Sequence, residues 1–582
     1  MKKSSINYLA IIVAAIFLTN CGGVNKMVKM AADVSYSVSP SILEMHGDSV
    51  EITVSGKFPP KYFNKKAIVT VTPMINTKSG DVSFDSYTLQ GEDVEANNQP
   101  IPFVNGGGFS YTDKVAYNED MRISTLNLKL TAAVGETSVD LPDQKLADGV
   151  VSTPLLLKVD PKAIKASDKF VRVTSDSYGA DIHYKINRAE VRNTELKEDD
   201  IKALEDFIKN ASSAERHHFT GAEILAYASP DGAEDLNTKL ASKREKSAET
   251  YLTKQFKKAK TDEFKAENFL TTKETPEDWD GFKALMQKSD IQDKELILRV
   301  LSMYSDPEVR EKEIKNISKA YEIIAEEILP KLRRSKMNIN IDKIGYSDEE
   351  LLVLIDSIPD SLNVEELLKA ATLTDDLDKQ LMVYQTIIKN VPECWRGHNN
   401  AGYVYLEKEM YAEAAKAFED ALGADNNNTM VLNSLGVINH INGDLEKAME
   451  YYDAAAGAGD VVGYNKGILA IKKGEYDIAL QNEFFKEPSF NFALAKLLNY
   501  SKSKNTGEFD AALGILKKVD DQDDAKLYYL KAIIGARQQN SELMINSLKT
   551  AFEKDDSLKK DALTDLEFAK YFEDSNFISI TQ

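Results

Sequence analysis

The feature that most constrains the fold is an internal repeat in the C-terminal part of the sequence. Gly402 and Gly436 lie 34 residues apart. The same spacing separates three further pairs, Ala414 and Ala448, Phe418 and Tyr452, and Ala421 and Ala455. Gly467 and Ala479 continue the pattern after a loop that is shorter by three residues. A helical sequence with such a period predicts units that bury their apolar faces only by stacking on one another.

This pattern resembles the tetratricopeptide repeat, which has the same period. The resemblance implies that the glycine and alanine positions let two helices approach closely, and that the aromatic residue packs on the next unit. We expect about five units between residues 347 and 582. A leading copy falls near 367–389 and a capping helix at 561–577. Such an array forms a curved α-solenoid with a concave groove for protein partners.

A second pattern joins a strand, a turn and a helix. The apolar run at 224–227 predicts a short strand, and residues 228–232, Ala-Ser-Pro-Asp-Gly, are rich in turn formers. One face of the helix that follows carries Asn237, Leu240, Arg244 and Ala248, three or four residues apart. We expect the turn and the exposed part of that face to form a small polar concavity for a charged ligand.

This second region resembles the OmpA-like, peptidoglycan-associating domain. The spacing of that family is present at Tyr227, Gly232, Asn237, Leu240 and Arg244. The resemblance implies an α/β OmpA-like domain at 170–346. Its other elements are expected at 180–187 (first strand), 195–210 (first helix), 269–272 (third strand) and 337–341 (closing strand), with a helical insertion at 275–325.

The resemblance also implies a ligand. In the family, an Asp of the turn and the Arg of the helix grip the amine and carboxylate of diaminopimelate, but here the Asp position is Ser229. A serine hydroxyl holds an ammonium only by a neutral hydrogen bond, about half as strong as a charge-assisted one. Asp231 can supply the charge from another place on the turn. The candidate peptidoglycan-binding residues are therefore Ser229, Asp231, Asn237 and Arg244. In the alternative interpretation Arg244 is a surface arginine and Ser229 only shapes the turn.

The N-terminus predicts a lipid anchor. Two lysines follow Met1, an apolar run follows at 9–18, and the sequence Leu-Thr-Asn-Cys ends at Cys21. This resembles a bacterial lipobox, which implies a signal peptide at 1–20, lipidation of Cys21 and a tether at 21–32. The alternative is an ordinary secretory signal with a chance cysteine. Gly22 is not the Asp that signals inner-membrane retention, so we expect an outer-membrane anchor with the body in the periplasm.

Residues 33–169 predict an antiparallel β-sandwich-like domain. Apolar and polar residues alternate at 50–54, 69–72 and 126–130, and clusters of proline, asparagine and glycine separate these runs. Short strands between turn clusters are typical of sandwiches. This domain carries no motif that points to chemistry.

Composition excludes several classes of function. The chain of 582 residues has 72 basic and 93 acidic residues, a net charge of −21, which disfavours nucleic acid and anionic lipid surfaces. Motifs of metallopeptidases, serine hydrolases and phosphate loops are missing from the sequence. His217 and His218 are adjacent, predicted in a loop, and point in different directions. We therefore expect no enzymatic activity, no metal and no cofactor.

Two functions fit these observations. In the first, the chain is a non-enzymatic envelope lipoprotein that links the outer membrane to peptidoglycan and scaffolds protein partners through its repeats. In the second, the OmpA-like domain no longer binds peptidoglycan and the chain is a subunit of an envelope assembly or secretion complex.

Overall fold

The computed structural model describes residues 22–481 and 484–582; Cys21 and the lipobox lie outside them. The chain divides into two compact units. The first comprises the chain up to Ala166 together with Val391–Gln582, and the second is Ser167–Asn390. In sequence, the second unit is therefore an insertion into the first. No helix within the described ranges is long and apolar enough to cross a membrane.

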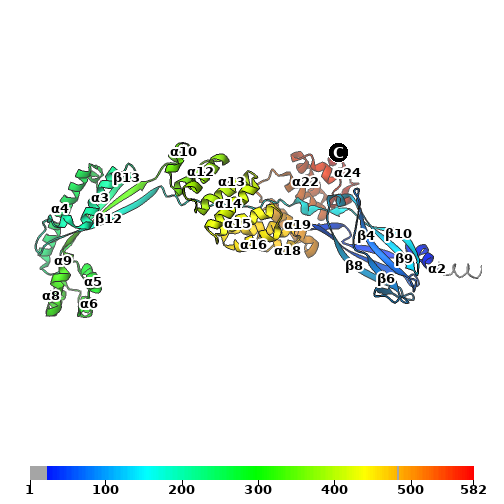
Figure 1. Ribbon diagram of the computed structural model, residues 1–582, viewed down its shortest axis with the longest axis horizontal. Helices are drawn as coiled ribbons and strands as arrows, with labels where there is room; N and C mark the ends of the chain where they lie inside the picture. The colour runs from blue at the N-terminus through cyan, green and yellow to red at the C-terminus, as the bar shows by residue number, and fades with distance from the viewer. Residues whose placement is uncertain (1–21, 482–483) are drawn as a thin grey trace, which may run out of the picture. The chain divides into compact units, whose positions relative to one another are not determined.

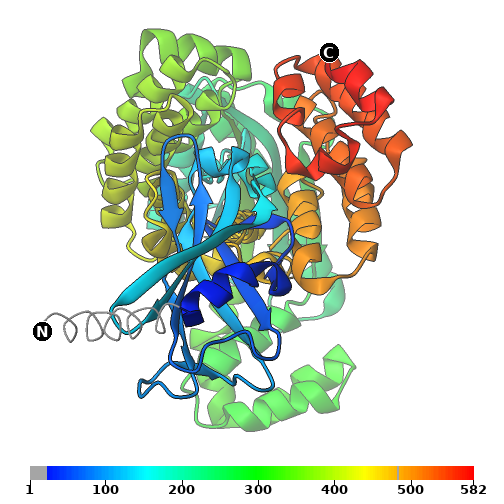
Figure 2. The ribbon, with the colours of Figure 1, turned by 90° about the vertical axis from the view of Figure 1, so that its right-hand side faces the viewer.

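The N-terminal part of the first unit is β-rich and contains two sheets (Figure 2). One sheet has the order β1-β3-β2-β11, with β8 paired to β3; its strands are β1 (Ser35–Ser39), β2 (Leu43–His46), β3 (Ser49–Phe58), β8 (Gly107–Ala116) and β11 (Val150–Val151). The other has the order β10-β9-β4-β6-β7, with β5 paired to β4; its strands are β4 (Ile68–Asn76), β5 (Asp81–Ser83), β6 (Tyr87–Gly91), β7 (Gln99–Ile101), β9 (Thr125–Val134) and β10 (Thr137–Asp148).

Alternation along the strands explains why both sheets share one core. Val54 of β3 and Leu128 of β9 belong to the same buried hydrophobic cluster. Short 3-10 turns lie before β1 at η1 (Ala31–Asp33), between β8 and β9 at η2 (Glu119–Ile123), and after β11 at η3 (Thr153–Leu156). The segment expected to be a tether contains the helix α2 (Gly22–Lys29), whose Met27 is fully buried in this core. The chain is therefore packed almost from the first described residue.

The C-terminal part of the first unit is helical (Figure 1). Its helices are α13 (Trp395–Glu407), α14 (Tyr411–Ala424), α15 (Thr429–Ile441), α16 (Leu445–Ala454), α17 (Asp460–Lys472), α18 (Tyr476–Ala479), α19 (Phe490–Ser503), α20 (Gly507–Leu516), α21 (Ala525–Arg537), α22 (Ser541–Lys554), α23 (Leu558–Ala562) and α24 (Ser575–Thr581), with 3-10 turns η7 (Ala456–Ala458) and η8 (Leu566–Tyr571). Consecutive helices pack in pairs, beginning with α13 on α14 and α15 on α16. The predicted repeat positions fall on these pairs, and the signature alanines at 414, 421, 448, 455 and 479 are all fully buried.

The second unit contains a four-stranded sheet covered by helices. The strands are β12 (Val173–His183), β13 (His217–Tyr227), β14 (Leu270–Thr275) and β15 (Arg334–Ile344), in the order β12-β15-β13-β14. β15 is antiparallel to both its neighbours, and β13 is parallel to β14. The helices α3 (Asp199–Ser213) and α4 (Glu234–Ala259) contribute Ile208 and Leu252 to the core over this sheet. Two 3-10 turns, η4 (Glu195–Lys197) and η5 (Glu263–Lys265), complete the connections.

The rest of the second unit is helical. The insertion predicted at 275–325 contains α5 (Trp279–Lys288), α6 (Lys294–Met303), α7 (Pro307–Asn316) and most of α8 (Ser318–Glu327), and α9 (Leu329–Leu332) follows it. These helices have a hydrophobic cluster of their own. The unit ends with α10 (Asp348–Ser357), η6 (Pro359–Ser361), α11 (Val364–Ala371) and α12 (Leu377–Asn390). The leading copy of the repeat that was expected at 367–389 falls on α11 and α12. His217 and His218 lie inside β13, because the strand begins earlier than the apolar run indicates.

Candidate functional sites

The turn between β13 and α4 carries the predicted ligand-binding residues, and the structure buries most of them. Ser229, Asn237 and Arg244 are only 5%, 4% and 1% exposed. The Asn237 amide donates a hydrogen bond to the carbonyl oxygen of Gly232, at 3.0 Å, and so fixes the turn. The prediction of an exposed polar face at these residues is therefore wrong, because the helix face that bears them packs inward.

Arg244 joins two separate backbone segments by hydrogen bonds from its guanidinium group. Its Nε donates to the carbonyl oxygen of Arg188 at 3.1 Å, and its Nη1 donates to the carbonyl oxygen of Tyr227 at 2.9 Å. The guanidinium carbon lies 5.2 Å from the centre of the Tyr184 ring. Burial lowers the pKa of Arg244 to about 10, so the side chain stays charged at neutral pH. Both interpretations made from the sequence, a surface arginine and an arginine aimed at Ser229, miss this role.

A different arginine reaches the turn. Arg333, just before β15, donates from Nε to the Ser229 hydroxyl at 3.2 Å and pairs through Nη2 with the Asp231 carboxylate at 3.0 Å. The Ser229 hydroxyl also donates to Asp231. The charge that Asp231 brings to the turn is thus already neutralised. In the sequence, Arg333 and Arg334 form a pair shortly before the expected closing strand, but no local pattern links Arg333 to Ser229.

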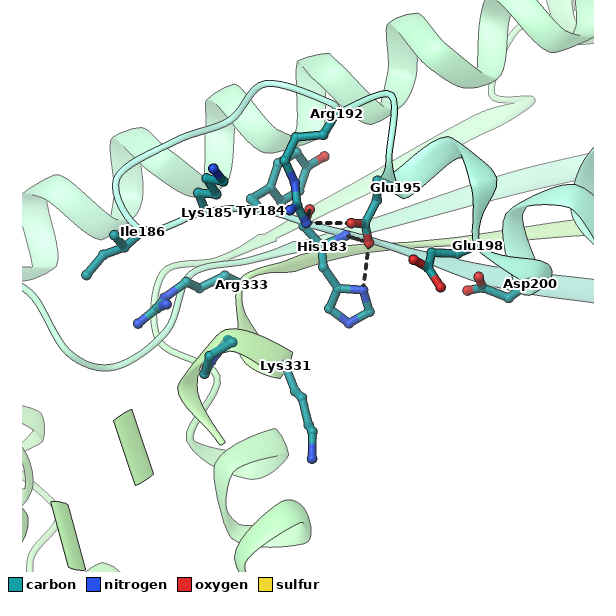
Figure 3. Close-up of a pocket in the computed structure, with 11 residues that line it drawn as sticks. His183, Tyr184, Lys185, Ile186, Arg192, Glu195, Glu198, Asp200, Lys331 and Arg333 are labelled. Atoms are coloured by element: carbon teal, nitrogen blue, oxygen red, sulfur yellow. Dashed lines mark hydrogen bonds and ion pairs between the residues drawn. The ribbon is translucent and has the colours of Figure 1, made fainter. Parts of the chain in front are cut away.

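Arg333 also lines a cavity of about 610 Å³, between the end of β12 and the end of α9 (Figure 3). Its walls are His183, Tyr184, Lys185, Ile186, Arg192, Glu195, Glu198, Asp200, Pro330, Lys331 and Arg333. Lys185 and Lys331 are exposed on the basic side, and Glu198 is exposed on the acidic side. The cavity therefore presents both signs of charge to solvent.

Glu195 organises the acidic side of this cavity. Its carboxylate is buried, accepts from the backbone N–H of His183 at 2.8 Å, and pairs with Arg192 at 2.6 Å (Figure 3). Glu195 is therefore a structural acid, and Glu198 is the carboxylate that a ligand can reach. A molecule that carries both an ammonium and a carboxylate is complementary to a cavity lined by groups of both charges.

The groove of the repeat array is the second candidate site. Residues 158–166, here called the linker, have no regular secondary structure. Three asparagines each pair with both backbone groups of one linker residue: Asn491 with Lys158, Asn465 with Lys162, and Asn400 with Ala166. The six hydrogen bonds measure 2.7–3.0 Å.

Two more asparagines extend this ladder. Asn433 donates to the carbonyl oxygen of Lys162 at 2.9 Å, and Asn399 donates to that of Ile164 at 2.8 Å. The five asparagines come from α13, α15, α17 and α19, the first helix of four successive pairs. The groove predicted to hold protein partners is therefore filled by the chain itself. The linker itself resembles an ordinary connection. The signal in the sequence is on the other side of the contact, where Asn399 and Asn433 lie one period of 34 residues apart.

Within residues 22–481 and 484–582, no group of three or more His, Cys, Asp and Glu side chains is placed to hold a metal ion. Cys394 is half-buried at the start of α13.

Comparisons with known proteins identify the repeats. A family model described as "Tetratricopeptide repeat" matches residues 383–429 and 400–461. The chain therefore contains tetratricopeptide repeats, and such repeats indicate protein partners. No curated protein matches the chain.

Several solved structures are similar over part of the chain. YrrB, described as a TPR protein with an unusual peptide-binding site, is 20% identical over 38% of this chain and all of its own, with a TM-score of 0.22. A tetratricopeptide repeat protein from Parabacteroides merdae is 16% identical over 42% of this chain and 95% of its own, with a TM-score of 0.28. PilF of Pseudomonas aeruginosa is 14% identical over 38% and 97%, with a TM-score of 0.29. Sequence identities of 14–20% and TM-scores of 0.22–0.29 identify no ligand or partner for this chain.

Proposed function

We propose that this tetratricopeptide-repeat protein is a non-enzymatic scaffold of the bacterial cell envelope, which holds protein partners through its repeats and binds peptidoglycan through its α/β region. A lipid on Cys21 would anchor it in the outer membrane, with the body in the periplasm. The lipobox at 18–21 and the OmpA-like spacing from Tyr227 to Arg244 support this location. The observation that carries the proposal is that Arg333 joins the Ser229–Asp231 turn to a cavity with walls of both charges.

The chemistry of the cavity suits diaminopimelate. The free end of that side chain carries an ammonium and a carboxylate on one carbon atom. Lys185 and Lys331 are exposed cations for the carboxylate, and Glu198 is an exposed anion for the ammonium. Charge-assisted hydrogen bonds are shorter and about twice as strong as neutral ones. The proposed ligand contacts therefore lie in the cavity beside the turn and not in the turn itself, because Asp231 in the turn is already paired.

A second function is favoured by a different observation. Both charged groups of the predicted site already have protein partners, Asp231 in Arg333 and Arg244 in two backbone carbonyl groups. A region whose charged side chains are already paired within the protein suits a protein-interaction platform in an envelope assembly or secretion complex. In that case the α/β region does not bind peptidoglycan.

Sedimentation with purified sacculi separates the two functions. The chain from residue 22 onward is mixed with sacculi at physiological salt, and the bound fraction is measured. We expect the wild type to co-sediment and the double variant Lys185→Ala, Lys331→Ala to lose most of the binding. The matched control is Lys254→Ala, Lys257→Ala, which removes two exposed lysines of α4 that do not line this cavity. It should bind as the wild type does.

Competition tests the ligand itself. Free meso-diaminopimelate at millimolar concentration should release the wild type from sacculi, whereas sodium chloride of equal ionic strength should not. A wild type that stays in solution favours the platform function. Equal losses in the cavity variant and the α4 control would mean that general charge, and not this cavity, drives the binding.

A further inference from the structure

The linker is held mainly through its backbone. The amide groups of Lys158, Lys162 and Ala166 are four residues apart, and each donates to an asparagine side chain of a different helix. The carbonyl groups of the same three residues accept from the same three asparagines. Contacts of this kind do not depend on the side chains of the bound segment. Other extended peptides can therefore make them.

Side chains of the linker add a preference for positive charge. Lys158 pairs with Asp524 at 2.6 Å and lies 5.0 Å from the centre of the Phe490 ring. The other two lysines also lie over aromatic rings of the groove: Lys162 over Tyr464 at 4.8 Å and Lys165 over Tyr403 at 5.5 Å. A cation over an aromatic face is stabilised by about 0.5–1 kcal/mol at exposed sites. The groove is thus shaped for an extended peptide with lysines three or four residues apart. It also holds an acidic side chain at one position, where the Tyr464 hydroxyl and the Asn491 amide donate to Asp160.

Few buried apolar side chains hold the linker in place. Pro161 and Ala166 are buried, whereas Val159 is 47% exposed. An extended segment held by hydrogen bonds and partly exposed cations can leave a groove without unfolding a core.

We propose that the groove of the repeat array is a peptide-binding site that the linker occupies in cis, so that an external peptide of the same extended, lysine-bearing kind binds only when the linker leaves. The site lies wholly within the first unit and does not depend on binding to peptidoglycan. Occupation by a covalently attached segment corresponds to an effective concentration on the order of millimolar. For an intrinsic Kd near 10 μM, the linker would weaken external binding about 100-fold.

The test uses a peptide of residues 155–168 with a fluorescent label. It is titrated against the wild-type chain and against a variant in which residues 157–166 are replaced by ten glycine and serine residues. We expect the variant to bind at least about 100-fold more tightly than the wild type. Equal binding to both proteins would show that the linker does not close the groove. A folded variant that fails to bind would show that the linker stays in the groove only because of its covalent connections.

Modified peptides test which groups of the ligand the groove recognises. Methylation of the Lys162 amide nitrogen removes the donor to Asn465 and should reduce binding more than tenfold. The control is methylation at Val159, whose amide group has no hydrogen-bond partner among the described residues. Equal effects of the two methyl groups would contradict recognition through the asparagine ladder. Replacement of Lys158, Lys162 and Lys165 by glutamine should weaken binding, and unchanged affinity would contradict the preference for a basic peptide.

A second measurement covers the case in which the replacement variant does not fold. In the full chain, hydrogen exchange at the Lys162 and Ala166 amides is compared between the wild type and the double variant Asn400→Ala, Asn465→Ala. Both amides should exchange more than tenfold faster in the variant, while those of β4 remain protected. Unchanged exchange would overturn the proposal.

Discussion

Gly436 lies directly against the ring of Tyr452. A Cβ atom built on Gly436 would come within 2.5 Å of two carbon atoms of that ring, closer than any real contact. The same relationship recurs at Gly402 with Phe418, at 2.6 Å, and at Gly467 with Phe485, at 2.5 Å. The glycine of the first helix and the aromatic ring that covers it are thus one packing unit of the array.

Substitution of Gly436 should therefore destabilise the array. Gly436→Leu forces a side chain into the Tyr452 ring and should lower the free energy of unfolding by about 1–3 kcal/mol or more. Gly423→Ala is the control, since a Cβ atom there meets nothing within 4 Å, and it should be neutral or slightly stabilising. Unfolding is followed by the fluorescence of Trp395 in a Trp279→Phe background, because these are the only tryptophans. Equal stability of the two variants would contradict the packing of helix pairs.

Arg244 should be required for folding of the second unit. Arg244→Ala leaves the carbonyl groups of Tyr227 and Arg188 without their donor and opens a space in the core. An unsatisfied buried group costs about 1–3 kcal/mol, and both of these hydrogen bonds are partly buried, so together with the lost packing a loss of about 3 kcal/mol is expected. Trp279 fluorescence in a Trp395→Phe background reports this unit. Arg299→Ala, at an exposed position of α6, should change stability by less than about 0.5 kcal/mol. A wild-type stability for Arg244→Ala would mean that the arginine does not hold the turn.

His440 should make the array less stable in acid. It is fully buried on α15, and burial together with the Lys472 charge lowers the pKa of His440 from 6.5 to about 4. Between these values the unfolded chain binds the proton and the folded chain does not. The contribution of His440 to the free energy of unfolding therefore falls as the pH drops from about 6.5 to about 4, by on the order of 3 kcal/mol.

The measurement for His440 is denaturant unfolding across that pH range for the wild type and His440→Gln. As the pH falls, the variant should become more stable relative to the wild type. Asp565 acts in the opposite direction to His440 over the same range, because burial and then Glu567 raise the pKa of Asp565 to about 6, so the folded chain binds this proton first. The difference between the two proteins isolates His440. A slope that persists unchanged in the variant would assign the acid sensitivity to other groups.

Glu567 and Arg537 form a buried ion pair that should not tolerate the loss of one partner. Arg537 donates to Glu567 from Nε at 2.8 Å and from Nη2 at 2.5 Å, and the Thr153 hydroxyl donates to the same carboxylate. Glu567→Gln removes the closest counter-ion of a buried guanidinium and leaves only the Glu44 carboxylate, 3.9 Å away. Breaking a buried ion pair in this way costs about 3–5 kcal/mol. The double variant Arg537→Met, Glu567→Leu removes both charges and should be less destabilised. A double variant that is less stable to unfolding than Glu567→Gln would contradict this account.

Cys21 should carry the lipid that the proposed location requires. Cells grown with labelled palmitate should label the wild type and the Cys394→Ala variant, but not Cys21→Ala. The two cysteines are the only ones in the chain, so each variant is the control for the other. Label on Cys21→Ala, or none on the wild type, would contradict the lipid anchor.

Much of the fold could be predicted from local pattern. The strand–turn–helix at 224–252 corresponds to the end of β13 and most of α4, and the expected closing strand at 337–341 lies within β15. The period of 34 residues located the helix pairs, and the match of the repeat family confirms it. In each case the residues that carry the signal are within one element or one repeat of each other. The predicted boundaries are less accurate, since β13 begins at His217 and not at 224.

The candidate site was only partly accessible to such patterns. The turn residues were placed, but Arg333, which pairs with Asp231 from 102 residues away, was not predicted as a partner. Arg244 was placed on the correct helix face, yet that face is buried. A helical period shows which residues share a face, and it does not show what covers that face.

By itself, the sequence determined the repeat period, the strand and helix positions and the motifs, because these depend on side-chain spacing within single elements. Only the tertiary structure decided what fills the groove of the array. The linker is separated from Asn491 by 333 residues of sequence and from Asn400 by 234. It is bound through amide and carbonyl groups that every residue other than proline possesses. A contact made by the backbone leaves no pattern in the side chains of the segment that makes it, so it becomes visible only when the chain is folded.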